Sequence, residues 1–378
     1  MAETTRLVDL VQKAIDDFLD EREPQLAAIA PELSPFVDYS RDLLRGGKRF
    51  RALFCYWGWQ AVSGRVPGFD PLPDTTGGDQ LQAAVRAASA LEIFHAAALV
   101  HDDIIDNSDT RRGGLAAHRR FEAAHLNEGW TGDPARFGKS AAVLLGDLLL
   151  AWSEEAFDAA LRHLAPEKAR GVDAGAAARA EFNRMRTEVM LGQYLDILDE
   201  QSWRSHPESE LLSRAYRVIV YKSAKYSVEA PLVIGAAIGG GTVEELAALR
   251  AFGLPLGIAY QLRDDLLGVF GDPVLTGKPS GDDLREGKRT VLIALARTGL
   301  PTNAARFLDE LLGDRGLSET QVQMLQAAIR ESGAVEQVER IIQHNVALAT
   351  TALQGAPITA SAREQLIQLA DTVITRSA

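Results

Sequence analysis

The sequence has very little cysteine, which limits the chemistry it can use. Cys55 is the only cysteine among 378 residues, so no disulfide can form within one chain. A single thiol fits a reducing compartment. Because Cys55 lies in an apolar run, we interpret it as a small buried side chain rather than a nucleophile.

Long apolar runs and a signal segment are also missing. The chain begins MAETTRLVDL, which has neither a basic start nor an apolar core of signal-peptide length. No uninterrupted apolar run reaches the roughly 18 residues of a membrane span. We therefore expect a soluble, cytoplasmic protein with no stable membrane insertion.

Positive charge is in deficit. The 40 Lys and Arg residues face 52 Asp and Glu residues, which leaves a net charge of −12. A field of that sign repels nucleic acid and anionic lipid, so we expect no nucleic-acid partner. An anionic substrate would have to be bound locally, by clustered bases or by a metal.

Strand patterns are scarce, whereas helical patterns fill the chain. Apolar residues from Leu7 to Leu19 repeat at helical spacing and predict an amphipathic first helix. Further helices are predicted from Ser34 to Gly46, over residues 79–106, 139–163, 173–200 and 209–238, from Thr242 with a kink at Pro255, and from capping-box spacings at Ser318 and Ser361. We predict an all-α fold in which residues 1–378 form one domain, a bundle of long helices around a central apolar cavity.

Residues 99–112, LVHDDIIDNSDTRR, are the most informative stretch. In a helix, Asp102 and Asp106 share one face. Their charges repel, so a cation is expected between them, and carboxylate oxygens suit Mg²⁺. A solvated acidic helix end is the alternative. The apolar run before the acids and Arg111 and Arg112 after them favour a site for a metal and a diphosphate.

Two other stretches support this interpretation. Residues 260–265, YQLRDD, end another apolar helix with Asp264 and Asp265, although position 268 is Gly rather than a third acid. Two such helix ends facing each other across a cavity could hold a metal cluster. In residues 45–51, RGGKRFR, bases beside two glycines let backbone and side chains approach a phosphate together. A solvated charge run is the alternative there.

Taken in order, these motifs resemble those of a known family. The matching residues are Gly46-Gly47-Lys48-Arg49-x-Arg51, His95, Asp102-Asp103-x-x-Asp106 with Arg111-Arg112-Gly113, Gly192-Gln193-x-x-Asp196, Lys222-Ser223, Gln261-x-x-Asp264-Asp265 and Gly277-Lys278. Over about residues 40–300 the chain resembles the trans-isoprenyl diphosphate synthases, the polyprenyl synthetase family, and is similar to geranylgeranyl diphosphate synthases among them. Ordered elements of this kind are far more specific than one DDxxD.

The resemblance implies a prenyltransferase of the isoprenoid synthase fold, usually a homodimer. Such enzymes use Mg²⁺ to join isopentenyl diphosphate to an allylic diphosphate: dimethylallyl, geranyl or farnesyl. Ionising the carbon–oxygen bond requires neutralisation of the charge on the leaving diphosphate, which divalent ions and bases can supply.

Residue roles follow from the resemblance alone. Asp102 and Asp106 would bind two Mg²⁺ ions and Asp264 a third, with Asp103 and Asp265 as indirect or partial ligands. Arg111, Lys222 and Lys278 would hold the allylic diphosphate, and Lys48, Arg51, His95 and Arg112 the isopentenyl diphosphate, with Gly47 and Gln193 in the same matched motifs. Lys222, Ser223 and Gln261 would direct dipoles at the developing carbocation.

The chain departs from the family pattern at two positions. Ser223 stands where Thr is usual and keeps the hydroxyl group, whereas Gly268 replaces a third Asp of many members. Lys288, in REGKRT, matches a family lysine near the site.

The product is expected to be geranylgeranyl diphosphate, with farnesyl or longer products as alternatives. Ala97 and Ala98, one turn before Asp102, are too small to block a growing chain, and Phe94 one turn further is a candidate floor. A class I terpene cyclase is a rival, but it would not need Lys48, Arg51 and His95. A non-catalytic subunit that binds prenyl diphosphates is another, but such a subunit would be expected to lose metal ligands or bases.

Overall fold

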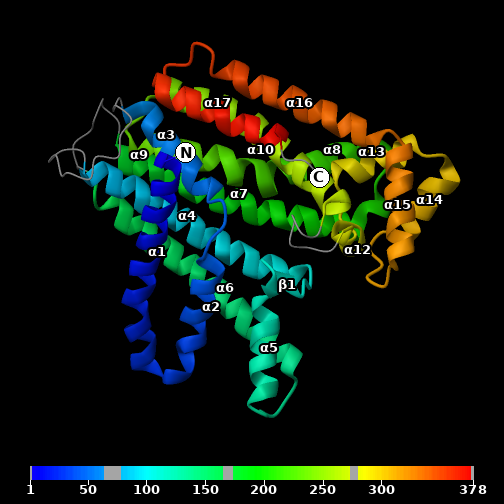
Figure 1. Cartoon of the computed structure of the whole chain (residues 1–378), viewed down its shortest axis with the longest axis horizontal. Helices are drawn as coiled ribbons and strands as arrows, with labels where there is room; N and C mark the ends of the chain where they lie inside the picture. The colour runs from blue at the N-terminus through cyan, green and yellow to red at the C-terminus, as the bar shows by residue number, and fades with distance from the viewer. Residues whose placement is uncertain (1, 64–77, 165–172, 273–279, 376–378) are drawn as a thin grey trace. The chain divides into compact units, whose positions relative to one another are not determined.

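The structure is a computed structural model that describes residues 2–63, 78–164, 173–272 and 280–375. Helices make up nearly all of these residues, which confirms the all-α prediction (Figure 1). The helices are α1 Ala2–Ile29, η1 Pro31–Leu33, α2 Ser34–Leu44, α3 Phe50–Ser63, α4 Gly78–Ile105, α5 Ala117–Asn127, α6 Pro134–Leu161, α7 Ala174–Ser202, η2 Trp203–Ser205, α8 Glu208–Val218, η3 Ile219–Glu229, α9 Ala230–Ile238, α10 Val243–Phe270, α12 Asp282–Glu286, α13 Val291–Gly299, α14 Thr302–Leu311, α15 Glu319–Glu331, α16 Ala334–Ala352 and α17 Ala360–Thr375. Two short strands, β1 Thr110–Arg111 and β2 Gly114–Leu115, form an antiparallel hairpin.

The chain folds into two compact units. Unit 1 comprises Met1–Ala178 and Ile234–Thr242, and unit 2 comprises Arg179–Val233 and Val243–Ala378. Two of the boundaries fall inside α7 and α9, so these two helices contribute residues to both units, and the third lies directly before α10.

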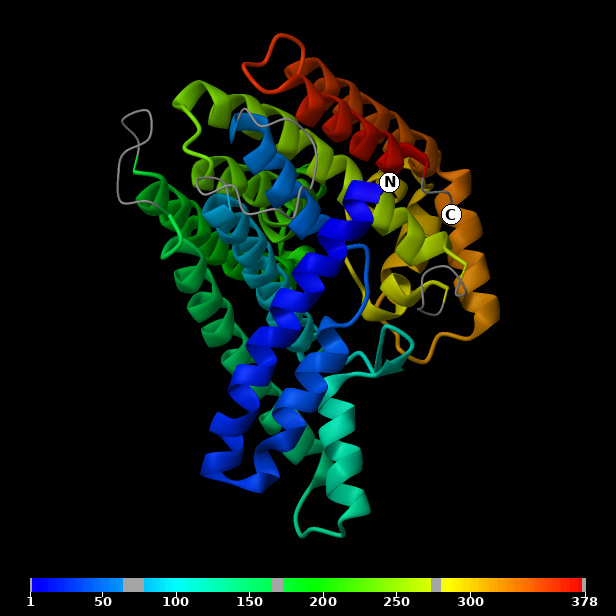
Figure 2. The same ribbon diagram turned by 60° about the vertical axis from the view of Figure 1, so that its left-hand side comes forward.

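Helix α4 lies at the centre of unit 1. It packs against α1, α3 and α6, and α5 packs on α6. Its small side chains let these neighbours approach closely, and those with no exposed surface are Ala83, Ala84, Ala87, Ala88, Ala90 and Ala97. On the facing helix, a Cβ atom added to Gly146 would lie 2.2 Å from the Nε2 atom of His101. Helices α1 and α2 lie side by side with opposite chain directions (Figures 1 and 2).

The same helix is long and apolar enough to span a membrane by composition. Residues Gln80–Ile105 have a window of mean hydropathy 1.4, although polar residues interrupt its apolar runs. However, 72% of that window is buried inside the protein. This burial is typical of a core helix, and α4 is surrounded by other helices of unit 1.

The Cys55 thiol is buried in α3, as the sequence predicts. It is 0% exposed, and burial raises its pKa to about 12. A thiol that stays protonated at neutral pH is a poor nucleophile, so Cys55 has a packing role.

Helix α10 lies at the centre of unit 2, where it packs against η3, α12, α13, α16 and α17. Arg263 of α10 donates both terminal nitrogens to the carboxylate of Glu339 in α16, at 2.5 and 2.8 Å. This bidentate, charge-assisted pair fixes the register between the two helices. Pro255 lies inside α10, which continues past it.

A π-helix interrupts the helix predicted over residues 209–238. The segment is divided into α8, the π-helix η3 and α9, and η3 carries Lys222 and Ser223. Segments of π-helix occur often at functional sites because they redirect side chains. The predicted helical span is therefore confirmed, since residues 208–238 are helical throughout, but its central segment is a π-helix rather than an α-helix.

Glycines hold η3 close to its neighbours in unit 2. A Cβ atom on Gly192 of α7 would lie 2.4 Å from the backbone N of Lys222, and one on Gly257 of α10 would lie 2.5 Å from the carbonyl oxygen of Ala224. Real Cβ atoms do not approach so closely. The backbone of η3 can therefore take this position only because residues 192 and 257 are glycines. These contacts position the part of the chain that carries Lys222.

The predicted helix ends are partly correct. Ser318 forms the expected capping box with Gln321. The predicted cap at Ser361 is wrong, because α17 already begins at Ala360 and the Thr359 hydroxyl accepts a hydrogen bond from the Ala362 N–H at 3.4 Å.

We expect Gly257→Ala to destabilise the protein by about 1 to 3 kcal/mol, because the added methyl group overpacks the contact with Ala224. Urea unfolding measures the change. Gly175→Ala is the matched control, since its Cβ atom would meet only Asp173 Oδ1 at 3.6 Å. Equal midpoints for the two variants would show that η3 moves aside freely.

Candidate active site

The first acidic cluster lies at the C-terminal end of α4 in unit 1. The helical turn continues past Ile105, since the Asp106 N–H donates to the Asp102 carbonyl at 2.8 Å. Asp103 and Asp106 are buried, with 1% and 8% exposure, and the side chain of Asp102 is 22% exposed. The predicted common face of Asp102 and Asp106 is therefore present.

The hairpin that follows α4 supplies a cation to this cluster. Arg111 donates through Nε to Asp103 Oδ1 at 2.9 Å, and its Nη2 lies 3.7 Å from Asp102 Oδ2. The hairpin turns through Arg112 and Gly113, which both have left-handed backbone angles. Arg111 thus compensates part of the negative charge at the acidic helix end, beside which the sequence places this arginine.

Arg112 connects the same hairpin to the basic segment. Its Nη1 donates to the carbonyl oxygens of Leu43 and Arg45, at 2.7 and 2.9 Å. Gly47 is left-handed, with a φ of +84°, and a Cβ atom there would lie 3.5 Å from Arg112 Nη2. Arg112 therefore holds the loop of Gly47 and Lys48 against the hairpin.

The bases of residues 45–51 do not share one environment. Lys48 is exposed and Arg51 is partly buried, whereas Arg49 is 4% exposed. Arg49 is bonded to Glu92 of α4 and Gln12 of α1, and neither acceptor was expected from the sequence. The prediction that all four bases can approach a phosphate is wrong for Arg49.

His95 lies among these cations. Burial lowers the pKa of His95 well below its usual range, and nearby guanidinium groups lower it further, in the order Arg51, Arg112, Arg111 and Arg49. Arg49 is paired with Glu92 and Arg111 with Asp103, whereas Nη1 of Arg112 donates to neutral carbonyl oxygens, so positive charge remains beside the neutral imidazole. Such a cluster is suited to an anion with several charges, as a diphosphate is.

The second acidic cluster lies near the C-terminal end of α10 in unit 2. The Gln261 amide donates to Asp265 Oδ1 at 2.8 Å. Burial is the main cause that raises the pKa of Asp265 to about 8, and the charges of Asp283 and Asp264 also raise it. The hydrogen bond from Gln261 acts in the opposite direction and lowers this pKa. Asp264 is partly exposed, whereas Asp265 is 5% exposed.

Asp283 of α12 occupies the space beside Gly268. A Cβ atom at position 268 would lie 2.0 Å from Asp283 Oδ2. The sequence motifs mark Gly268 as a missing acid and assign no role to Asp283. The repeated acids in residues 281–288, GDDLREGK, were the available signal.

The remaining site residues predicted in unit 2 are basic or polar. Lys222 of η3 donates to Asp196 Oδ2 of α7 at 2.5 Å, and Gln193 lies one turn before Asp196. Nζ of Lys288 lies 2.9 Å from Oε2 of Glu286. Ser223 follows Lys222 in η3 and is partly buried. Lys278 lies outside the described residues.

The acidic side chains fit a hard divalent cation. All donors at both acidic helix ends are carboxylate oxygens, which suit Mg²⁺ better than metals that prefer nitrogen or sulfur. Asp265 Oδ2 is buried without a hydrogen-bond partner among the described residues, as expected of an acceptor awaiting a cation or its water. In the described ranges, no three His, Cys, Asp or Glu side chains form a ready metal site. Mg²⁺ needs only one or two carboxylates when substrate phosphates complete its shell.

The chain-length candidates lie on α4 before the first acidic cluster. Phe94 and Ala97 are 1% and 0% exposed, and Ala98 is partly exposed. Phe94, Ala98 and Asp102 are spaced four residues apart and lie along one stripe of the helix. Phe94 therefore lies about 12 Å along the helix axis from Asp102.

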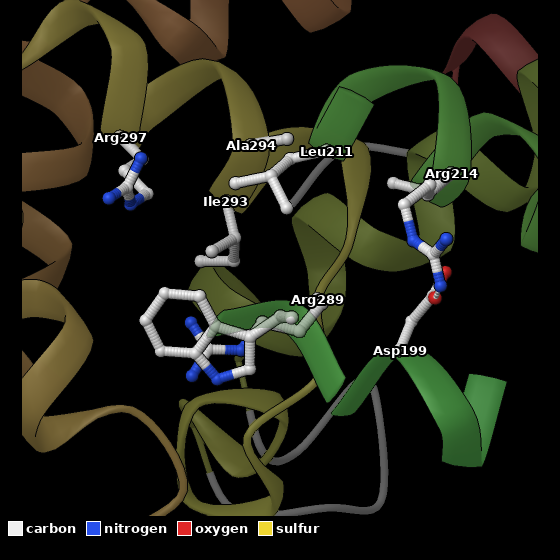
Figure 3. Close-up of a pocket in the computed structure, with 9 residues that line it drawn as sticks. Asp199, Leu211, Arg214, Arg289, Ile293, Ala294 and Arg297 are labelled. Atoms are coloured by element: carbon white, nitrogen blue, oxygen red, sulfur yellow. Dashed lines mark hydrogen bonds and ion pairs between the residues drawn. The ribbon is translucent and has the colours of Figure 1, made fainter. Parts of the chain in front are cut away.

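A separate pocket in unit 2 is lined by arginines and apolar side chains (Figure 3). Its lining residues are Asp199, Trp203, Leu211, Arg214, Ala215, Arg289, Ile293, Ala294 and Arg297. Arg214 is paired with Asp199, and Arg297 is paired with Glu208 and Asp309. The positive charges of these two arginines are therefore compensated. Arg289 lies with its Cζ 3.8 Å from the centre of the Trp203 ring. Because Arg289 directly follows Lys288, this cluster anchors the segment that carries Lys288.

Comparison with known proteins decides the family. The family model described as Polyprenyl synthetase matches residues 33–329. The chain belongs to the polyprenyl synthetase family. It is therefore a trans-prenyltransferase, and the function predicted from the sequence motifs is confirmed at this level.

Relatives of this prenyltransferase cover most or nearly all of its length. The short chain isoprenyl diphosphate synthase of Methanothermobacter thermautotrophicus is 28% identical over 98% of both chains. The geranylfarnesyl diphosphate synthase of Aeropyrum pernix is 30% identical and covers 79% of this chain and 85% of its own. The structure of geranylgeranyl pyrophosphate synthase from Corynebacterium glutamicum, complexed with isoprenyl diphosphate and magnesium, is 37% identical with a TM-score of 0.88 and covers 98% of this chain and 99% of that chain.

We expect the ring of His95 to remain neutral at pH 6, because burial and the surrounding arginines disfavour its charged form. In the unfolded chain this ring takes up a proton below about pH 6.5, whereas in the folded chain it does not. The free energy of unfolding therefore decreases as the pH falls below that value. NMR titration of the ring, assigned with His95→Gln, measures the pKa. Saturating pyrophosphate should raise that pKa, and an unchanged value would separate His95 from the anion site.

Proposed function

We propose that this prenyltransferase condenses isopentenyl diphosphate head-to-tail with allylic diphosphates and releases mainly geranylgeranyl diphosphate. The observation that carries the proposal is in unit 1, where one hairpin joins two oppositely charged groups. Arg111 contacts the acidic end of α4, and Arg112 contacts the carbonyl of Arg45 in the basic loop and lies near His95. An acidic end for a metal-bound diphosphate and a cationic cluster for a second one are what a two-substrate synthase requires.

The acidic residues would hold about three Mg²⁺ ions, two on Asp102 and Asp106 and one on Asp264, with Asp103 and Asp265 assisting. When bound, these ions neutralise the diphosphate that leaves the allylic substrate. Arg111, Lys222 and Lys278 add positive charge to the same group. The Gln261 and Ser223 dipoles and the Lys222 backbone favour positive charge on the remaining carbon chain.

The basic residues would hold the second substrate. Lys48, Arg51, Arg112 and neutral His95 can donate hydrogen bonds to isopentenyl diphosphate, and the left-handed Gly47 brings the backbone close. Gln193 and Lys288 would complete the polar lining. A terpene cyclase has one diphosphate to bind, so this cationic cluster favours the synthase over the cyclase.

We also propose that the whole chain acts as one catalytic domain and that two copies form a homodimer in the cytoplasm. Exposed apolar side chains support a second copy as the partner. Leu144 of α6 is 60% exposed, and Met190, Leu191 and Tyr194 of α7 are 47%, 59% and 59% exposed. Light scattering would return the mass of one chain if this proposal were wrong.

Product analysis tests the reaction. The protein is incubated with labelled isopentenyl diphosphate, Mg²⁺ and each allylic primer in turn, and the dephosphorylated products are sized. Elongated linear alcohols support the synthase, whereas cyclic hydrocarbons or unchanged primer contradict it.

Both acidic clusters should be needed for turnover. We expect Asp102→Ala and Asp264→Ala each to lower kcat by about 10²-fold or more with the helical content unchanged, because each removes a carboxylate that holds the metal. Removing Mg²⁺ with a chelator should abolish turnover of the parent enzyme. Near-normal kcat in either variant would restrict the metal site to the other cluster.

Product length should respond to the stripe of α4 before Asp102. Ala98→Phe and Ala97→Phe should shorten the product, because the ring would fill the path next to the acidic end. Phe94→Ala should lengthen it, since Phe94 lies about two helical turns from Asp102. Chromatography of the alcohols measures the distribution. The same distribution in all three variants would place the growing chain along another face.

A further inference from the structure

Arg49 differs from the basic residues that flank it. Lys48 is exposed, whereas the side chain of Arg49 has 1% of its surface exposed. Its backbone is left-handed, with a φ of 50°. A residue other than glycine adopts this conformation at a cost in free energy, so surrounding contacts must hold it there.

Three helices supply those contacts. Nη1 of Arg49 donates to Glu92 Oε2 in α4 at 3.1 Å, and Nη2 donates to Gln12 Oε1 in α1 at 2.5 Å. Nη2 also donates to the carbonyl oxygen of Leu44, the last residue of α2. Arg49 thus ties the loop between α2 and α3 to α1 and α4.

The orientation of the Gln12 amide is determined by its neighbours. Arginine has only donors, so Gln12 must present its oxygen to Arg49. Its nitrogen then donates to Asp16 Oδ1, one turn further along α1, at 3.0 Å. The bond from α1 to Arg49 is therefore specific rather than incidental.

Glu92 links the same group to the start of α3. Its Oε1 accepts from the backbone N of Ala52 at 3.3 Å, and the Arg49 carbonyl accepts from the Leu53 N–H at 2.9 Å. Arg51 lies in this first helical turn. The hydrogen-bonded group of Gln12, Arg49 and Glu92 is therefore bonded to Leu44 and Ala52, on both sides of the segment that carries Lys48 and Arg51.

We infer that Gln12 and Arg49 are positioning residues for the isopentenyl diphosphate site, and that α1 belongs to its framework. Helix α1 precedes residues 33–329, the part that matches the family model. The inference rests on the proposed function for the identity of the diphosphate. The contacts that carry it lie entirely within unit 1.

Gln12→Leu is the decisive variant, because it removes the acceptor in α1 and leaves the buried pair of Arg49 and Glu92 intact. Loss of one charge-assisted hydrogen bond corresponds to about a tenfold effect, and we expect that rise in KM for isopentenyl diphosphate. KM for the allylic primer and kcat should change less than about twofold, since no contact to the acidic end is removed. Gln12→Glu keeps an acceptor and should restore the parent KM.

Lys13→Ala is the matched control on the same helix. Lys13 is exposed and pairs with Asp17, away from the loop, so its loss should leave both KM values unchanged. Lys48→Ala is the positive comparison, and its pattern across the two substrates should match that of Gln12→Leu. Equal KM changes for both substrates in Gln12→Leu would overturn the inference and indicate a general loss of structure.

Hydrogen exchange of the ligand-free protein provides a second readout. Amides of residues 46–53 should exchange faster in Gln12→Leu, while those of residues 96–105 in α4 stay unchanged. If the parent protein shows no synthase activity, the proposed function fails, yet the exchange comparison still tests whether α1 fixes the loop. Unchanged exchange together with unchanged KM would refute the positioning role.

Discussion

The structure depends on one constraint: carboxylates at the ends of buried helices must have their charge compensated. Helices α4 and α10 are each the central helix of a unit, and each carries carboxylates where it leaves the core. A buried charge that loses its partner costs several kcal/mol. In unit 1 the hairpin places Arg111 against Asp103. In unit 2 the solution is different, because Asp265 is held by Gln261 and has a raised pKa.

Helices were predictable from the sequence wherever their signals are local. The prediction of residues 79–106 for α4 differs from Gly78–Ile105 by one residue at each end, because a dense apolar pattern stops at the acids. The π-helix η3 was not predictable, since neither glycine nor proline marks a change of helix type within residues 219–229. Its geometry depends on glycines in α7 and α10, which are far away in sequence. The hairpin was missed because strands of two residues carry no periodic pattern.

In the candidate site, too, local sequence signals predicted some features, and residues distant in the chain decided others. Helical spacing alone places Asp102 and Asp106 on one face, and the structure has that arrangement. Spacing could not separate Lys48 from Arg49, because the partner that buries Arg49 is Glu92, 43 residues along the chain. Charge runs therefore locate a site but do not say which of their members face a ligand. Packing against other helices decides that.

The space beside Gly268 has a consequence for how this protein can vary. It holds the carboxylate of Asp283, and a side chain on α10 at that point would require this carboxylate to move. A substitution at position 268 therefore also changes the placement of Asp283. An aspartate introduced at 268 alone would add one carboxylate and shift another, so its effect on activity would report both changes together.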